Sequence, residues 1–402
     1  MVVKRSDLRG AVRLTADATA GLTDLVEAMH ERIARLPGSQ APAQAGRTGG
    51  ITGLVYKSIR GVTRLVGGSL DALLGLLAPA LAAGPDAGPA SAQREAVVAA
   101  LNGVLGDHLL RTGNPLATPM ALRHAGHALA LERDALARQW PAPGGRLLVL
   151  VHGLCMNDVQ WSREAHDHGA MLAHEHGYTP IYLHYNSGRH ISENGRDFAQ
   201  QLERLIALWP HRIERFALLC HSMGGLVARS ALHQGAQAGP RWPARLDDLV
   251  FLGTPHHGAP LERAGHWLDL ILGATPYAAP LARLGQVRSA GITDLRHGYL
   301  VDADWAGRDR FARGSTHRLH VPLPDGVRCY AVAASTGQRS GDLKDRLLGD
   351  GLVPLDSALG RHAQPGRSLA FAPDRQWIGH GMNHLDLLNH PEVSARLSRW
   401  LA

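Results

Sequence analysis

A serine in the middle of the chain stands where an apolar run passes into a helical pattern. Residues 216–225 read Phe-Ala-Leu-Leu-Cys-His-Ser-Met-Gly-Gly, with Ser222 at the junction. A serine on such a sharp strand-to-helix turn exposes its hydroxyl for nucleophilic attack. Small residues must lie two places before and two places after it. Gly224 meets the second need, and Cys220 stands where glycine is usual. The alternative is a turn that only caps the helix.

A second apolar run, 147–151, ends in a His-Gly pair. Attack by Ser222 on a carbonyl carbon would create an oxyanion, which two fixed hydrogen-bond donors must stabilise. We expect the backbone N–H of Met223, directly after the serine, to be one donor. The backbone N–H of Leu154 would be the other, and Gly153 would let the backbone approach the substrate closely.

The elements that position these residues follow a regular rhythm. Apolar runs at 147–151, 180–184, 216–220, 249–252 and 327–332 alternate with helical patterns at 161–175, 194–208 and 223–235. Residues 120–124 and 127–131 flank a turn at Gly126, which is typical of a β-hairpin. Buried strands that alternate with helices predict an α/β fold with a mostly parallel sheet and helices on both faces.

Five segments carry a resemblance to a known family. They are LVHGL at 150–154, CHSMGG at 220–225, LGTPHHGAPLERAGH at 252–266, GDGLVPLDSA at 349–358 and NHLDLL at 383–388. The chain resembles the lipase-like α/β-hydrolases over roughly residues 118 to 400. It is most similar to the bacterial lipase/esterase group related to the GPI inositol-deacylase-like hydrolases. The resemblance implies the α/β-hydrolase fold and ester hydrolysis, with the catalytic residues in the order serine, acid, histidine.

The acid that matches the family is Asp350, in a Gly-Asp-Gly loop after the predicted strand at 327–332. Its carboxylate would orient the histidine ring and stabilise its cationic form. Three other aspartates compete for this role. Asp342 lies nearby, Asp345 is in a helix-like stretch, and Asp356 could cap a following turn.

The base that matches the family is His384, in a loop after an apolar stretch near 376–378. It would accept the Ser222 proton and return it to the leaving group. His380 and His390 are its competitors. The choice of His384 over His380 follows the family's His-Leu-Asp segment.

Other polar residues near these motifs are expected to be structural. His221 would pack against its neighbours, and His256 and His257 lack the spacing of a zinc site. Asp386 lies where some similar lipases bind calcium, but no partner carboxylate is evident. We therefore predict no metal and no cofactor.

The chain is expected to divide into a helical N-terminal extension, 1–112, and an α/β-hydrolase domain, 113–402. Within the extension, helical patterns at 7–36, 51–81 and 92–111 are separated by linker-like stretches at 37–50 and 82–91. The strand–helix rhythm lapses at 258–322, where an apolar insertion could form a cap or lid over the site. The alternative for 258–322 is an ordinary surface excursion.

Charge and composition suggest where the protein acts. The net charge is +7, and the stretch 51–81 carries Lys57, Arg60 and Arg64 on one side of an apolar helical pattern. Such a helix could lie on an anionic membrane, or it could pack on the main domain. There is no secretory signal pattern, no apolar run long enough for a spanning helix, and too few cysteines for a disulfide framework. We expect a cytoplasmic protein, peripheral at the membrane if 51–81 binds there.

These observations favour a serine hydrolase that cleaves a carboxylic ester, with a lipid-like acyl chain, through an acyl-enzyme on Ser222. A thioesterase, an acyltransferase or an intracellular polyester depolymerase would use the same residues. A membrane- or partner-binding scaffold is the alternative from another class. Nucleic acid is not an expected partner, because aromatic residues make up only 5% of the chain and no recognition motif occurs.

Overall fold

The computed structural model of the chain describes residues 10, 13–14, 92–141, 144–238, 241–259, 289–308, 318–337 and 349–402. Several predictions from the sequence lie outside the described residues: the stretches 37–50, 51–81 and 82–91, and all but three residues of 7–36. The same is true of 260–288 and 309–317 within the predicted cap.

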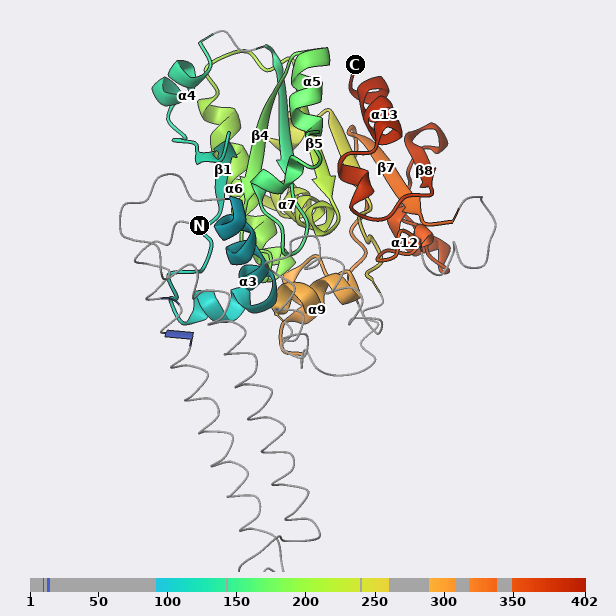
Figure 1. The fold of residues 1–402 in the computed structure, drawn as a ribbon. Helices are drawn as coiled ribbons and strands as arrows, with labels where there is room; N and C mark the ends of the chain where they lie inside the picture. Colours follow the sequence, from blue (N-terminus) through green and yellow to red (C-terminus); the bar gives the residue numbers. More distant parts are fainter. Residues whose placement is uncertain are drawn as a thin grey trace, which may run out of the picture.

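The strands of the described residues form one eight-stranded sheet in the order β2-β1-β4-β3-β5-β6-β7-β8 (Figure 1). They are β1 (Ala121–His124), β2 (His127–Ala128), β3 (Arg146–Val151), β4 (Tyr178–His184), β5 (Arg215–His221), β6 (Asp248–Leu252), β7 (Arg328–Ser335) and β8 (Gln376–His380). β3 to β8 run parallel, and β1 pairs antiparallel with both β2 and β4. The predicted hairpin and the mostly parallel sheet are confirmed.

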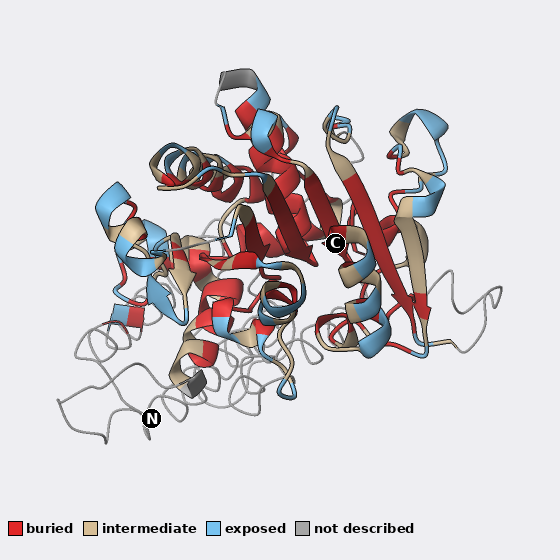
Figure 2. Cartoon of the chain, turned by 90° about the horizontal axis from the view of Figure 1, so that it is seen from above, coloured by how far each residue is buried: buried red, intermediate tan, exposed pale blue. Residues whose placement is uncertain are grey.

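The sheet is buried on both faces, which explains why its central strands read as continuous apolar runs. Along β3, Leu147, Val149 and Val151 belong to one core cluster. Leu148 and Leu150 point to the other face and belong to a second cluster. Figure 2 shows the buried strands between the outer helices.

Helices cover both faces, as predicted. One core cluster draws on α3 (Ala92–Arg111), α6 (Ile191–Leu208), α7 (Met223–Ala238) and α9 (Ala290–His297), and the other on α5 (His168–His176) and α13 (Pro391–Leu401). In α13, Val393, Leu397 and Leu401 recur every four residues and are fully buried, as expected of an amphipathic helix. None of the described helices is long and apolar enough to cross a membrane.

Short helical segments complete the described structure. They are α4 (Arg133–Gln139), α10 (Asp302–Trp305), α12 (Leu355–Ala358) and 3₁₀ turns at Asp158–Trp161, Pro243–Arg245, Pro365–Arg367, Pro373–Arg375 and Asp386–Leu388.

The helix predicted at 161–175 begins later than expected. The side chain of Asn157 accepts the N–H of Gln160 and closes a separate 3₁₀ turn that ends at Trp161. The α-helix α5 starts only at His168, where the Asp167 side chain accepts the N–H of Ala170 at 2.9 Å. Two side-chain caps thus divide one apparent helical pattern into two elements.

Candidate active site

Ser222 lies between the last residue of β5 and the first residue of α7, at the carboxyl end of a central strand. Its φ angle is +53°, an unusual value for a residue with a side chain. Its N–H donates to the carbonyl of Leu252 at 2.8 Å, which ties the turn to the end of β6. This is the strained strand-to-helix turn predicted from the sequence.

Close packing explains the small residues after the serine. A methyl group at Gly224 would lie 2.4 Å from the carbonyl oxygen of Val151, on the neighbouring strand. A methyl group at Gly225 would lie 2.1 Å from the Thr254 hydroxyl oxygen. Cys220 occupies the remaining position, with its side chain fully buried in the core. Burial also raises the pKa of the Cys220 thiol, so the thiol stays protonated.

Asp350 and His384 form a buried pair, each with only 1% of its surface exposed. His384 Nδ1 lies 2.6 Å from Asp350 Oδ2. A carboxylate only accepts hydrogen bonds, so Nδ1 carries a proton, and in the neutral ring Nε2 presents the lone pair. Asp350 Oδ1 accepts the backbone N–H groups of Leu352 and Val353 at 2.9 and 2.8 Å, which fixes the carboxylate.

The rival residues lie elsewhere. Asp342 and Asp345 are outside the described residues. Asp356 is in the first turn of α12. His380 ends β8, and His390 caps α13 by accepting the N–H of Glu392. Among the described acid and base candidates, Asp350 and His384 are joined by a hydrogen bond.

The serine and the histidine both contact the segment at the end of β6. A methyl group at Gly253 would lie 3.0 Å from two atoms of the His384 ring. The carbonyl of Leu252, directly before Gly253, accepts the Ser222 N–H. His221 Nε2 lies 3.2 Å from the carbonyl oxygen of His384, and their rings are 4.7 Å apart. Among the described residues no hydrogen bond joins the Ser222 hydroxyl to His384. Such bonds are often long before a substrate is bound.

The predicted oxyanion donors flank the serine. A methyl group at Gly153 would lie 3.0 Å from Cβ of Ser222, so the loop after β3 contacts the nucleophile. The N–H of Leu154 makes no hydrogen bond with any residue in the described part of the chain. Met223 is the first residue of α7, and its N–H has no partner within the helix. Both N–H groups are therefore free to bind an oxyanion.

Residues that the sequence did not reveal fix the loop after β3, which is named the oxyanion loop for the donor predicted at Leu154. Cys155 has a φ angle of +59°, and its N–H donates to Ser187 Oγ at 3.0 Å. Cys155 also contacts α3, because a methyl group at Gly103 would lie 2.2 Å from Cys155 Sγ and 2.9 Å from Cys155 Cα. The Tyr185 hydroxyl donates to the carbonyl of His152 at 2.8 Å. The one sequence feature that hints at this contact is the pair Gly103 and Gly106 within the helical pattern of α3.

Two histidines beside the serine are neutral and structural. Burial lowers the pKa of His152 to about 3, and its Nδ1–H donates to the carbonyl of Gly153 at 2.8 Å. Burial, followed by the nearby His384, holds the pKa of His221 well below its usual value.

His256 packs between the rings of Phe251 and Phe371. No group of histidine, cysteine and acidic side chains in the described residues could hold a metal ion.

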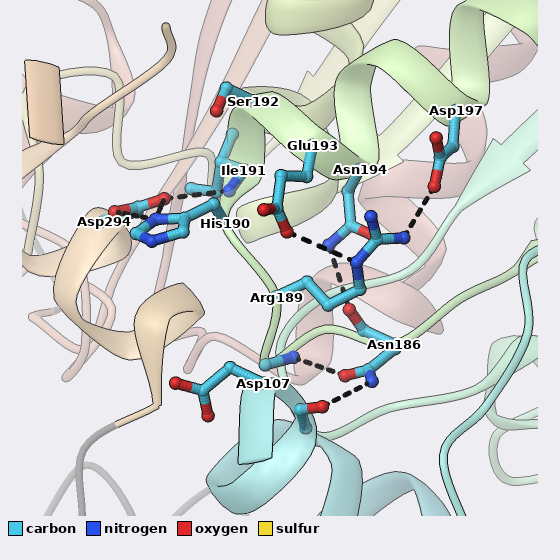
Figure 3. Close-up of polar contacts among 12 residues, drawn as sticks. Asp107, Asn186, Arg189, His190, Ile191, Ser192, Glu193, Asn194, Asp197 and Asp294 are labelled. Carbon is cyan, nitrogen blue, oxygen red and sulfur yellow. Dashed lines mark hydrogen bonds and ion pairs between the residues drawn. The ribbon is translucent and has the colours of Figure 1, made fainter. Parts of the chain in front are cut away.

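Part of the predicted cap is anchored to the main domain, as Figure 3 shows. Asp294 of α9 accepts the N–H of Ile191 at 2.8 Å and contacts His190 Nδ1 at 3.0 Å. His190 in turn stacks on Trp305 with ring centroids 3.6 Å apart. Burial raises the pKa of Asp294 to about 6, partly offset by His190. These contacts attach residues 289–308 to the start of α6.

The mostly parallel sheet, the strained serine turn at the carboxyl end of β5, and the order serine, aspartate, histidine define the α/β-hydrolase fold. A family model described as a domain of unknown function, DUF7379, matches residues 115–295. This span includes the oxyanion loop and Ser222 but ends before Asp350 and His384. No curated protein matches the sequence.

Solved structures similar to this chain have low sequence identity to it. The mature lipase BlEst2 of Bacillus licheniformis is 19% identical, covering 64% of this chain and 92% of its own, with a TM-score of 0.40. The esterase Pf2001 of Pyrococcus furiosus is 14% identical, covering 64% of this chain and 81% of its own, with a TM-score of 0.37. The RedJ thioesterase of Streptomyces coelicolor is 16% identical, covering 65% and 91%, with a TM-score of 0.35.

Proposed function

We propose that this protein is a serine hydrolase that cleaves carboxylic esters through an acyl-enzyme on Ser222. The observation that carries the proposal is the buried Asp350–His384 pair, 2.6 Å apart, beside a serine held at a positive φ angle. Nε2 of His384 has no partner among the described residues, and in the neutral ring it carries the lone pair. A general base needs such a lone pair to accept the serine proton.

The proposed reaction has two halves. The Ser222 oxygen attacks the carbonyl carbon while its proton passes to His384 Nε2, and the N–H groups of Leu154 and Met223 bind the oxyanion. The bond to the leaving alcohol then breaks as His384 returns the proton to the alcohol oxygen. Water, deprotonated by His384, next attacks the acyl carbon, which releases the acid and restores Ser222.

We propose that the ester substrate carries a lipid-like acyl chain. Its support is the apolar insertion at 258–322, which follows the strand that ends beside His384. A thioesterase, an acyltransferase or a polyester depolymerase would share the acyl-enzyme and differ in leaving group or acceptor. The resemblance to GPI inositol-deacylase-like hydrolases stays a prediction.

A p-nitrophenyl ester series of increasing acyl length tests the proposal, with Ser222→Ala as the inactive control. We expect turnover to rise with acyl length and to be lost in the variant. Turnover confined to short chains would remove the lipid preference and keep the esterase. Faster turnover of matched thioesters than of oxygen esters would favour the thioesterase, and equal rates for Ser222→Ala and wild type would refute the serine mechanism.

The stretch 51–81 motivates a separate proposal, that a cytoplasmic protein contacts anionic membranes through its basic side chains. Co-sedimentation of the full chain with phosphatidylserine-containing vesicles tests it. We expect binding that weakens with salt and is lost when Lys57, Arg60 and Arg64 are replaced by glutamine. Binding unchanged by these replacements would contradict the role of this stretch.

A further inference from the structure

Cationic and imidazole side chains gather around a small cavity away from the serine. The cavity lies between α7, the segment after β6 and the segment before β7. Its polar lining is formed by Arg229, His256, His257, Arg318, His320 and Arg367. No acidic side chain of the described chain lines it.

Arg229, at the base of the cavity, is buried with 4% of its surface exposed. One terminal nitrogen lies 3.4 Å from His256 Nδ1, and the other donates to the carbonyl of Val321. Its Nε–H has no hydrogen-bond partner, and no carboxylate of the described residues forms an ion pair with it. A buried guanidinium without a counter-charge is strongly unfavourable.

Arg318 adds a second positive charge without a matching carboxylate. It donates to the carbonyl of His256 at 3.0 Å and contacts His257 Nδ1. The negative charge of Asp304 favours the charged form of Arg318, but the two side chains form no ion pair. The Asp304 carboxylate instead accepts the N–H groups of Leu300, Val301 and Leu319.

His256 is a neutral neighbour of Arg229. Its Nδ1 faces the guanidinium of Arg229, which can only donate, so the proton of the neutral ring lies on Nε2. Nε2 is buried and has no hydrogen-bond partner among the described residues. Burial, and then the charge of Arg229, hold the pKa of His256 well below its usual value, so the ring remains neutral.

We propose that this cavity binds a single-atom anion such as chloride, held by the guanidinium groups of Arg229 and Arg318. The cavity is small, with a volume of about 10 Å³, so a small anion is the natural occupant to test first. Water would fill the space but would bring no negative charge to Arg229, which forms no ion pair with any carboxylate of the described residues. The anion brings the charge that the described residues do not provide.

The cavity lies against the segment that follows β6. The N–H of His256 donates to the carbonyl of Ser357 at 3.1 Å, and Gly253 in the same segment packs against His384. The bound anion would therefore stabilise the fold around the catalytic loops. The inference stands independently of the ester hydrolase proposal.

Thermal unfolding of the full chain tests the inference at constant ionic strength, with sodium gluconate exchanged for sodium chloride. We expect chloride to raise the Tm by about 2–4 °C in a saturable manner, because a ligand that binds only the folded state stabilises it. Arg229→Met and, at the cavity mouth, Arg318→Gln should lose this rise. Arg361→Gln, at an exposed position outside the cavity, should retain it.

A bromide-soaked crystal provides a direct check, with an anomalous peak expected between Arg229 and Arg318. Equal Tm values in gluconate and chloride would overturn the proposal and indicate that the charges are balanced from within the chain. A larger rise with phosphate than with chloride would overturn the assignment to a single-atom anion. If Arg229→Met does not fold, the wild-type titration and Arg318→Gln still decide the question.

Discussion

At the scale of single residues, both oxygens of Asp350 are occupied, and each has a different role. Oδ1 is held by two backbone N–H groups and Oδ2 by His384. The first set fixes the loop, and the second orients the ring. The sequence pointed to both residues because each follows a predicted apolar stretch near the chain end and matches a motif of the lipase-like family that the chain resembles. It could not show that His390 caps α13, since that depends on the turn around it.

Asp350→Asn separates the two roles of this side chain. The amide oxygen can still accept the loop N–H groups, but the neutral side chain no longer fixes the His384 proton on Nδ1 or stabilises the charged ring. We expect kcat on a p-nitrophenyl ester to fall by about 10⁴-fold with the circular dichroism spectrum unchanged. A loss of less than tenfold in a folded variant would show that Asp350 is not the acid.

At the scale of elements, α3 contacts the oxyanion loop although it precedes the region that the family model matches. Gly103 presses on Cys155, and Gly106 packs against the side chain of Asn186, which donates to the Gly106 carbonyl. Helical periodicity predicted α3 correctly. The contact itself joins residues about 50 positions apart in the sequence, and a helical pattern carries no information about such a partner.

Gly103→Ala tests whether α3 positions the oxyanion donors. Alanine normally stabilises a helix relative to glycine, so any loss must come from the contact with Cys155. We expect kcat to fall by about 10–100-fold with little change in KM, since small displacements of catalytic groups are costly. Leu110→Ala, at an exposed position of the same helix, is the matched control and should leave kcat unchanged. Unchanged kinetics in Gly103→Ala would show that the loop is positioned without α3.

At the scale of the whole molecule, the alternation of apolar runs and helical patterns predicted the sheet because each central strand is buried on both faces. The strand order, with β3 between β4 and β5, could not be read from that pattern, because it depends on how the crossover helices pack. The buried cationic cavity was also missed, since its arginines come from segments that meet only in the folded chain.

Buried neutral histidines make the fold sensitive to acid. Burial lowers the pKa of His152 to about 3 and that of His168 to about 4. The unfolded chain binds these protons near pH 6.5, so stability is complete above pH 6.5 and is lost as the pH falls towards 4. Between pH 6.5 and 5 we expect a loss of about 1.6 kcal/mol for each of the two residues.

Urea unfolding at a series of pH values measures this loss. The slope of the unfolding free energy against pH should be smaller in His168→Gln than in wild type, whatever the variant costs at pH 7. A free energy that stays constant from pH 6.5 to 5 would contradict the account of these histidines.

The most direct test of the central claim is intact-mass and peptide mass spectrometry after exposure to a fluorophosphonate. The account predicts a single adduct on Ser222, absent in Ser222→Ala and formed much more slowly in His384→Ala. An adduct on another residue, or none on the folded wild-type protein, would contradict the claim that Ser222 is an activated nucleophile.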